Sequence, residues 1–253
     1  MLRELFQYRE FLITSVHKDI RGKYKGSFLG ILWSFINPLL TTFIYSIIFS
    51  VLLRSTQEHY VVFVIIGVLP WTWFTNTMSM TNTYLINGGI IKKVYFPREI
   101  LSISVVTSGL INFLISCVII LAFVFFSGIG FSINLIYLPL ILVVQYILQL
   151  GLFMIVSSID VYVRDLEYIV NFFVQMLFYG TPILYSVDMF GKFKWLLNLN
   201  PLTTIIGSYR DIFYYKTAPN FEALGIVFLF SLGVLLIGTL IFKKLEKGFA
   251  EEV

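Results

Sequence analysis

The sequence predicts an all-α polytopic membrane protein with six transmembrane helices. No charged side chain occurs between Ile100 and Ile159, and hydrophobic residues make up 58% of the 253-residue chain, against 13% charged residues. An apolar helix of about 20 residues crosses the hydrocarbon core of a bilayer, and this composition would be anomalous for a globular enzyme. The six predicted spans are 28–53, 60–86, 101–126, 133–159, 168–187 and 223–242.

The residues before the first span predict a helix that lies along the membrane surface. Apolar side chains recur at roughly helical spacing over residues 2–20, with charged side chains between them, which is typical of an interfacial amphipathic helix. A frayed cytoplasmic tail is the alternative. The long charged stretch also differs from a cleavable signal peptide, so we expect the amino terminus to be retained. The prediction is one membrane domain, 1–253, with a cytoplasmic interfacial segment 1–27, a six-span region 28–242 and a cytoplasmic tail 243–253.

The distribution of Lys and Arg predicts the orientation of the spans. Positive charges are enriched in short cytoplasmic loops. If the amino terminus is cytoplasmic, most of the 18 Lys and Arg lie inside, and the outer set is Arg54, Lys192, Lys194, Arg210 and Lys216. Both termini are therefore predicted to be cytoplasmic. The net charge of +4 then follows from topology and anionic lipid, and nucleic-acid binding is not needed to explain it.

Helix-breaking residues interrupt several predicted spans, at Pro38, Pro70, Pro139 and Gly180-Thr181-Pro182. Such breaks are tolerated in a membrane where protein or a cavity satisfies the freed backbone groups. The fifth span is the most affected, and two short apolar patches, 187–190 and 195–199, follow it. We expect a re-entrant or interfacial hairpin on the outer face between the fifth and sixth spans, with an ordinary extracellular loop as the alternative.

The chain lacks the groups that an energy-coupling or catalytic site needs. No G-x-x-x-x-G-K-[ST] phosphate loop occurs. Carboxylates and histidines fall in predicted loops or at span ends, which disfavours coupling to an ion gradient. The single cysteine, Cys117, offers no disulfide or thiolate metal site. We expect no catalytic residue, metal or cofactor on this chain. Three classes of protein stay open at this point: a passive pore, an intramembrane enzyme, and a membrane subunit driven by a separate ATPase.

Uncharged polar and aromatic side chains within the spans mark candidate functional surfaces. Gln145 and Gln149 share a helix face, as do Asn171, Gln175 and Tyr179; such side chains either hydrogen-bond between helices or line a wet path. The aromatics near the breaks either form an interfacial belt or a stacking surface for sugar rings. The loop 87–99 places aromatics beside cations, which suits either lipid headgroups or a protein partner.

Motifs along most of the chain resemble those of type-2 ABC exporter permeases that move polysaccharides and teichoic acids. Residues 18–40, KDIRGKYKGSFLGILWSFINPLL, are similar to the amino-terminal signature of that family. Further matches are GVLPW at 67–71, KKVYFPRE at 92–99, VRD at 163–165, TPILY at 181–185, NPL at 200–202 and YR at 209–210. Because these matches occur in order over most of the chain, the resemblance is specific.

The resemblance implies a homodimer in the bacterial cytoplasmic membrane, with two ATP-binding cassette subunits docked beneath it. ATP and Mg would be bound by those subunits, and the substrate would be a lipid-linked polysaccharide such as O-antigen, capsule or teichoic acid. A related exporter of a drug or small lipid, and a membrane subunit with no transport role, are the alternatives.

The resemblance also implies three sets of site residues. The loop after the second span would dock the ATPase through Lys92, Lys93, Val94, Tyr95, Phe96 and Pro97. The cytoplasmic entrance would be formed by Lys18, Arg21, Lys23, Tyr24 and Lys25. Together with the polar helix faces and the aromatics beside the breaks, the resemblance predicts a translocation path lined by Trp33, Asn37, Trp71, Trp73, Asn171, Gln175, Tyr179 and Tyr185.

Overall fold

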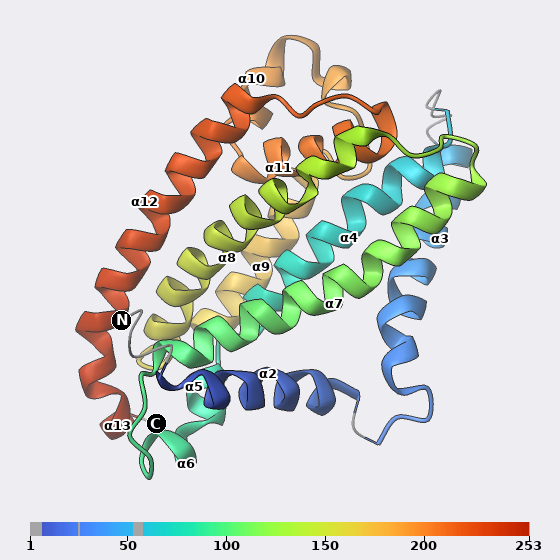
Figure 1. The fold of residues 1–253 in the computed structure, drawn as a ribbon. Coiled ribbons are helices and arrows are strands. Elements are labelled where there is room, and N and C mark those ends of the chain that lie inside the picture. The colour runs from blue at the N-terminus through green and yellow to red at the C-terminus, as the bar shows by residue number, and fades with distance from the viewer. Residues whose placement is uncertain (1–6, 25, 53–57, 253) are drawn as a thin grey trace.

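The computed structural model describes residues 7–24, 26–52 and 58–252, and every regular element in these ranges is a helix. Long helices run side by side as a bundle, with short helices at both of its ends (Figure 1). The longer helices are α2 (Arg9–Tyr24), α3 (Trp33–Leu52), α4 (Tyr60–Met78), α7 (Glu99–Phe126), α8 (Leu138–Asp160), α9 (Leu166–Tyr179), α11 (Pro201–Arg210) and α12 (Phe221–Leu245). The all-α prediction is confirmed for the described residues.

Short helices connect the long ones. They are η1 (Gly30–Leu32), α5 (Thr83–Ile86), α6 (Gly88–Ile91), η2 (Ile133–Tyr137), η3 (Val187–Phe193), α10 (Lys194–Asn198), the π-helix η4 (Asp211–Tyr215), η5 (Glu246–Gly248) and α13 (Phe249–Glu252). In Figure 1, α5, α6 and α13 gather at one end of the bundle, where α2 also lies, and α10 lies at the other.

Four helices in the described ranges are long and apolar enough to cross a bilayer, and they correspond to the predicted second, third, fourth and sixth spans. They are α4, α7, α8 and α12. The predicted first span corresponds to α3. The predicted fifth span corresponds to α9, whose apolar helical stretch is shorter, at Leu166–Tyr179. The 14 residues of α9 rise about 21 Å, which is less than the roughly 30 Å hydrocarbon core.

The second span ends earlier than the sequence pattern predicts. Helix α4 stops at Met78 rather than at Ile86, and α5 forms a separate turn of helix beyond it. The residues between Thr75 and Thr83 alternate Thr, Asn and Ser with Met. Side chains of these polar types hydrogen-bond to the local backbone and so compete with a continuous helix. The Thr77 and Thr83 hydroxyls do so here, donating to the carbonyls of Trp73 and Met80.

Proline and asparagine set the starts of later helices. Pro139, which the sequence marks as a break, lies in the first turn of α8, where its missing N–H costs no hydrogen bond. The side chain of Asn200 accepts a hydrogen bond from the Leu202 amide at the start of α11. Asn220 caps α12 in the same way through the Ala223 amide. These positions therefore punctuate the bundle rather than kink its spans.

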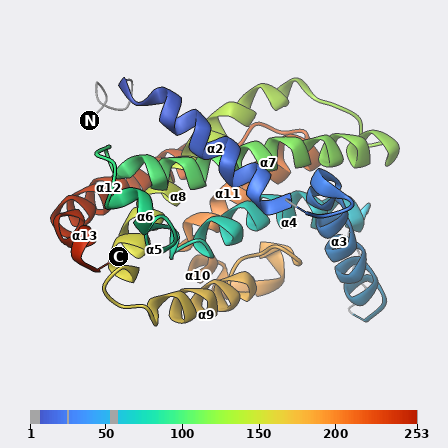
Figure 2. The ribbon, with the colours of Figure 1, turned by 90° about the horizontal axis from the view of Figure 1, so that it is seen from below.

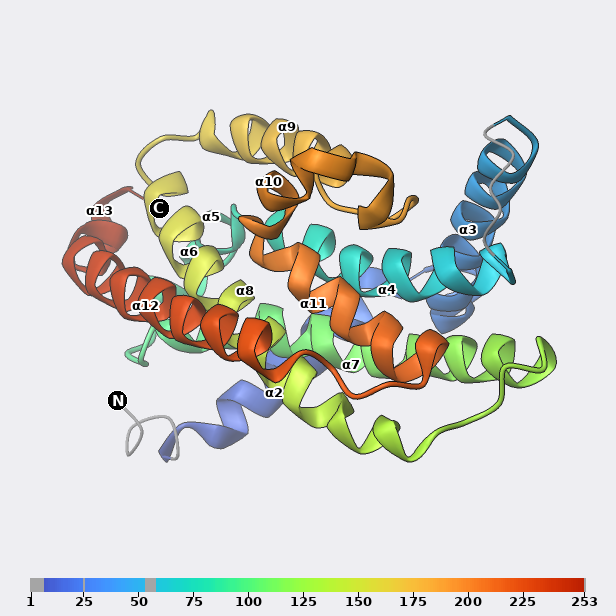
Figure 3. The same ribbon diagram turned by 90° about the horizontal axis from the view of Figure 1, so that it is seen from above.

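The segment between α9 and α12 turns back into the bundle. Helix α9 ends at Tyr179, with Gly180 as its cap. After a turn and two short helices, α11 packs against α4, α8 and α12. Figure 3 shows α11 among the long helices rather than outside them. Its buried apolar side chains include Leu202, Ile205, Ile206 and Tyr209. Helix α11, which lies in the segment that the sequence predicts to be a hairpin, thus contributes directly to the core.

Helices α8 and α12 approach each other at glycine. A Cβ atom on Gly151 would lie 2.6 Å from the Leu235 backbone nitrogen, and one on Gly238 would lie 2.5 Å from the Gly151 carbonyl oxygen. Only glycine allows this backbone contact. Small residues at helix crossings are typical of membrane bundles, where close van der Waals packing replaces the hydrophobic driving force between helices.

Helix α2 lies across one end of the bundle and packs against α7 (Figure 2). Its Asp19 carboxylate accepts hydrogen bonds from Ser104 at 3.2 Å and from Ser108 at 3.5 Å, both on α7. Its Phe11 ring lies 4.6 Å from that of Phe96. The predicted helix in this region is confirmed from Arg9 onward, and it carries a buried face toward the bundle and an exposed charged face.

Candidate translocation path and docking surface

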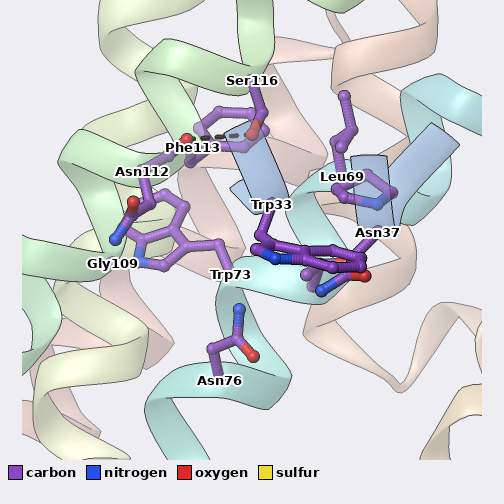
Figure 4. Close-up of a pocket in the computed structure, with 11 residues that line it drawn as sticks. Trp33, Asn37, Leu69, Trp73, Asn76, Gly109, Asn112, Phe113 and Ser116 are labelled. Atoms are coloured by element: carbon purple, nitrogen blue, oxygen red, sulfur yellow. Dashed lines mark hydrogen bonds between the residues drawn. The ribbon is translucent and has the colours of Figure 1, made fainter. Parts of the chain in front are cut away.

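A hollow with polar and aromatic walls lies between α3, α4 and α7 (Figure 4). Its volume is about 180 Å³. Helix α3 contributes Trp33 and Asn37, and α4 contributes Trp73 and Asn76. Asn112 from α7 forms part of the opposite wall. Three amide side chains and two indole rings therefore surround one space, without a charged group among its lining residues.

A second hollow of about 310 Å³ lies between α3, α4 and α9. Trp71 from α4 and Gln175 and Tyr179 from α9 line it, and Thr72 and Asn76 line both hollows. The Trp71 ring packs edge-on against Phe178, with centroids 5.6 Å apart. A polar strip on α4 thus separates two spaces, and α3 contributes a wall to each.

The structure brings six of the eight predicted path residues to these two hollows. Trp33, Asn37 and Trp73 line the first, and Trp71, Gln175 and Tyr179 line the second. The remaining two lie beside the second hollow's α9 wall. Asn171 accepts a hydrogen bond from Ser79 at 3.2 Å, and the Tyr185 hydroxyl donates to the Tyr179 carbonyl at 2.7 Å.

Exposure differs sharply among these aromatics. The Tyr179 side chain is 74% exposed, whereas that of Trp73 is 2% exposed. The Trp73 ring stacks on Phe113 at 5.4 Å and its Nε1 donates to the Val106 carbonyl at 3.4 Å. Gly109 leaves room for this ring, since a Cβ there would lie 2.6 Å from it. Trp73 therefore holds the wall in place, while Tyr179 is available for contact.

The buried glutamines join helices rather than line a hollow. Gln145 donates to the Pro70 carbonyl at 3.0 Å and accepts from the Tyr209 hydroxyl at 2.8 Å, which links α8 to α4 and α11. Gln149 accepts from Thr77 at 3.0 Å. Both glutamines are at most 1% exposed. Of the two readings that the sequence allows for this pair, the structure supports hydrogen bonding between helices.

Arg210 is a structurally important residue that the sequence pattern assigns to an outer loop. The structure buries it on α11, where its guanidinium donates to the Pro182 carbonyl at 2.5 Å and the Ile183 carbonyl at 2.6 Å. It also lies 3.6 Å from the centre of the Phe63 ring. The Tyr60 hydroxyl donates to the next carbonyl, that of Leu184. The Thr181-Pro182 break is the feature of the sequence that could have indicated this burial, because a chain leaving a helix has free carbonyls that need hydrogen-bond donors.

The predicted docking loop divides into exposed and buried residues. Lys92, Lys93, Val94 and Tyr95 are exposed, and the Tyr95 side chain is 90% exposed. Phe96 instead is 5% exposed, because it packs on Phe11 of α2. Pro97, which follows it, is partly buried.

This loop forms one wall of a hollow of about 890 Å³ whose other wall is the end of α12 and the tail. Lys243, Glu246 and Lys247 lie on that second wall. The Arg98 guanidinium donates to the Glu246 carbonyl, which ties the loop to the tail. The loop and the tail therefore form one surface.

The predicted entrance residues lie on and after α2. Lys18 donates to the Asn87 side-chain oxygen at 2.7 Å, which links α2 to the connection between α5 and α6. Arg21 is exposed. Lys25 and the side chains of Lys23 and Tyr24 lie outside the described residues.

Comparison with known proteins identifies the family. Residues 10–214 match the model of the ABC-2 type transporter. Two proteins named O-antigen export system permease protein RfbA from Klebsiella pneumoniae are 38% and 36% identical to this chain, over 96% of it and 94% of each relative. A third of the same name, from Myxococcus xanthus, is 32% identical over 100% of this chain and 99% of the relative. With several apolar helices of membrane-spanning length and this match over most of its length, the chain belongs to the ABC-2 type transporter family, as a multi-pass membrane permease subunit.

Proposed function

We propose that this chain is the permease subunit of an ATP-driven exporter that moves a lipid-linked polysaccharide of the O-antigen type across the bacterial cytoplasmic membrane. The observation that carries the proposal is that relatives named as O-antigen export permeases align over at least 94% of their own length. The uncharged polar and aromatic walls of the two hollows on α4 support it.

The chemistry of these walls suits a sugar polymer. The amides of Asn37, Asn76 and Gln175 can both donate and accept hydrogen bonds, as sugar hydroxyls do. The exposed ring of Tyr179 offers a flat apolar face without a strong directional bond, which allows a polymer to slide. A path without charged lining residues would bind such a substrate weakly at each step, as transport requires.

The size of the hollows supports the proposal of a homodimer. Their volumes of about 180 and 310 Å³ lie at or below the roughly 300–1,000 Å³ of a small-molecule pocket, so one chain does not enclose a polymer. Two copies that face each other across the α3, α4 and α9 surfaces would complete the path. The drug or small-lipid exporter is the alternative outcome of the test below.

We further propose that all six predicted segments cross the membrane with both termini cytoplasmic. The 20 residues of α3 rise about 30 Å, enough for one span. The shorter α9 would be completed at the outer face by the segment from η3 to α11, which is the re-entrant hairpin. Two separate ATP-binding subunits, with ATP and Mg, would dock on the loop after α5 and α6.

Complementation tests the substrate. In a strain whose own permease gene is deleted, this chain with its genetic partner ATPase should restore surface glycan and remove accumulated lipid-linked glycan from the cytoplasmic leaflet. Tyr179→Ala should lower the export rate per assembled transporter. Phe173→Ala is the matched control, because this exposed aromatic on α9 lies outside the lining of both hollows. Unchanged glycan with altered export of a small lipid would refute the polysaccharide assignment.

Topology is tested by cysteine labelling in a Cys117→Ser background. Cysteine at the exposed position of Lys92 should react with an impermeant reagent only in inverted vesicles, and cysteine at Lys192 should react in intact cells. Labelling of position 92 from outside intact cells would overturn the proposed orientation.

A further inference from the structure

A hollow with an acidic lining lies at the same end of the bundle as the docking loop. Its volume is about 500 Å³, and its polar lining residues are Asn82, Asp160, Arg164, Asp165, Glu167 and Tyr168. Three carboxylates therefore meet one cation there. Val161, the neighbour of Asp160, packs in one apolar cluster with Ile91 and Phe96 beside the docking loop. The acidic hollow and the docking loop are thus parts of one end of the molecule.

Asp160 is the unusual member of this lining. Its side chain is 1% exposed, and neither carboxylate oxygen has a hydrogen-bond partner of normal geometry among the described residues. The Thr81 hydroxyl and the Glu167 backbone face it without such geometry, and the Glu167 carboxylate repels it. A buried carboxylate without a partner is costly. The lining is therefore incomplete in the free subunit.

The chemistry of the missing group follows from charge and shape. Anionic headgroups, nucleotides and anionic polymers are repelled by three carboxylates. No group of three Asp, Glu, His or Cys side chains in the described ranges is arranged to hold a metal ion. A Lys or Arg side chain suits this lining, because its apolar stem can pack on Leu85 and Ile86 while its charged head faces the carboxylates.

We propose that this hollow receives a basic side chain of the partner ATPase, with Asp160 as its buried counterion. The inference rests on the proposed function, because it needs that ATPase to dock at this end. The neighbouring hollow carries the opposite sign, with Lys92, Lys93, Lys243 and Lys247 on its walls. Two adjacent hollows of opposite charge fix the orientation of a partner as well as its affinity.

Titration of the purified ATPase against the full-length permease in nanodiscs tests the proposal. Asp160→Asn should weaken binding roughly tenfold or more, because it leaves the partner's charge unpaired, and should reduce the salt dependence of the dissociation constant. It should also leave the midpoint of thermal unfolding equal or higher, because it removes a buried unpaired charge. A purely structural role of Asp160 would not give weaker ATPase binding together with equal or higher stability.

Control variants separate the alternatives. Glu167 is only partly buried, and Glu167→Gln keeps the hydrogen bond from Asn82. This variant should therefore fold even if Asp160→Asn does not, and it should weaken binding of the ATPase. Glu222→Gln makes the same charge change in the exposed first turn of α12 and should leave binding unchanged. Arg164→Ala should leave binding equal or stronger, since it removes the cation that competes for the hollow.

Four results would overturn the proposal. Wild-type permease that binds no ATPase refutes the proposed function and this inference together. Normal wild-type binding with unchanged Asp160→Asn and Glu167→Gln binding refutes the inference alone. Arg164→Ala with the same loss as Asp160→Asn would assign the counterion to this chain. If Asp160→Asn loses the permease dimer in light-scattering measurements but still binds the ATPase, the group that pairs with Asp160 belongs to a second copy of this chain.

Discussion

Replacing Gly151 by alanine tests the packing of α8 on α12. The added Cβ would lie 2.6 Å from the Leu235 nitrogen and 2.7 Å from its Cα, against ordinary contacts of 3.4 Å or more. Both neighbours are backbone atoms, so no side-chain rotation relieves the clash. The two helices must separate locally by about 0.8 Å, and a gap of that size removes a quarter to a half of each dispersion contact.

The expected cost follows from two opposing terms. Overpacking costs about 1–3 kcal/mol, and the better helix propensity of alanine returns up to about 1 kcal/mol. We therefore expect Gly151→Ala to lower the free energy of unfolding by about 1.5 kcal/mol, the middle of a net range of about 0–3 kcal/mol. Gly233→Ala on α12 is the matched control, because nothing lies within 4 Å of its added Cβ. It should be neutral or stabilise by up to about 1 kcal/mol.

Steric trapping in bicelles measures both free energies of unfolding without detergent denaturation. The reasoning is refuted if Gly151→Ala is as stable as Gly233→Ala. Gly238→Ala provides an independent check, because its added Cβ would meet the carbonyl oxygen of Gly151 from the other helix. It should destabilise by a similar amount, and the two effects should not add, since the first separation already relieves the second clash.

Three further changes test the docking surface, the hairpin and α2. Phe96→Ala should destabilise the permease by about 3–5 kcal/mol because it empties a buried aromatic site. Tyr95→Ala should change stability by less than about 0.5 kcal/mol and should abolish copurification of the ATPase. Equal stability of the two variants would contradict this prediction. Arg210→Met should lower the free energy of unfolding by roughly 1–3 kcal/mol for each carbonyl left unpaired. A variant as stable as the wild type would contradict a stabilising role for the hydrogen bonds from Arg210 to Pro182 and Ile183. Burial raises the pKa of the Asp19 carboxyl, so its contribution to the docking of α2 is greatest below its unfolded pKa and is lost as the pH rises through the raised value. Asp19→Asn should remove that pH dependence in hydrogen exchange of α2, and an unaltered profile would refute it.

The sequence by itself was sufficient for elements whose environment is lipid. Helices α7 and α8 occupy the predicted spans within a few residues at each end, because an uninterrupted apolar run has no other stable arrangement in a bilayer. The amphipathic pattern before the first span likewise predicts α2. These elements depend on local composition, and local composition is what a sequence displays.

Residues that face other helices could not be assigned in this way. Phe96 and Tyr95 are adjacent aromatics on one short loop, yet Phe96 is buried by Phe11 and Tyr95 is exposed. The sequence also allowed two roles for Gln145, and the position of Tyr209 on α11 decides between them. Each outcome depends on a partner distant in sequence.

Charged residues give the clearest contrast. The sequence analysis places Asp160 in a loop or at a span end and counts Arg210 among the outer positive charges. The tertiary structure buries both side chains in different surroundings. Arg210 donates to carbonyls at the Thr-Pro break, whereas Asp160 has no hydrogen-bond partner of normal geometry among the described residues and shares its hollow with residues of α5 and the start of α9. Composition determines which segments enter the membrane. Only the packing of those segments determines which polar groups are left without water and which partners they then require.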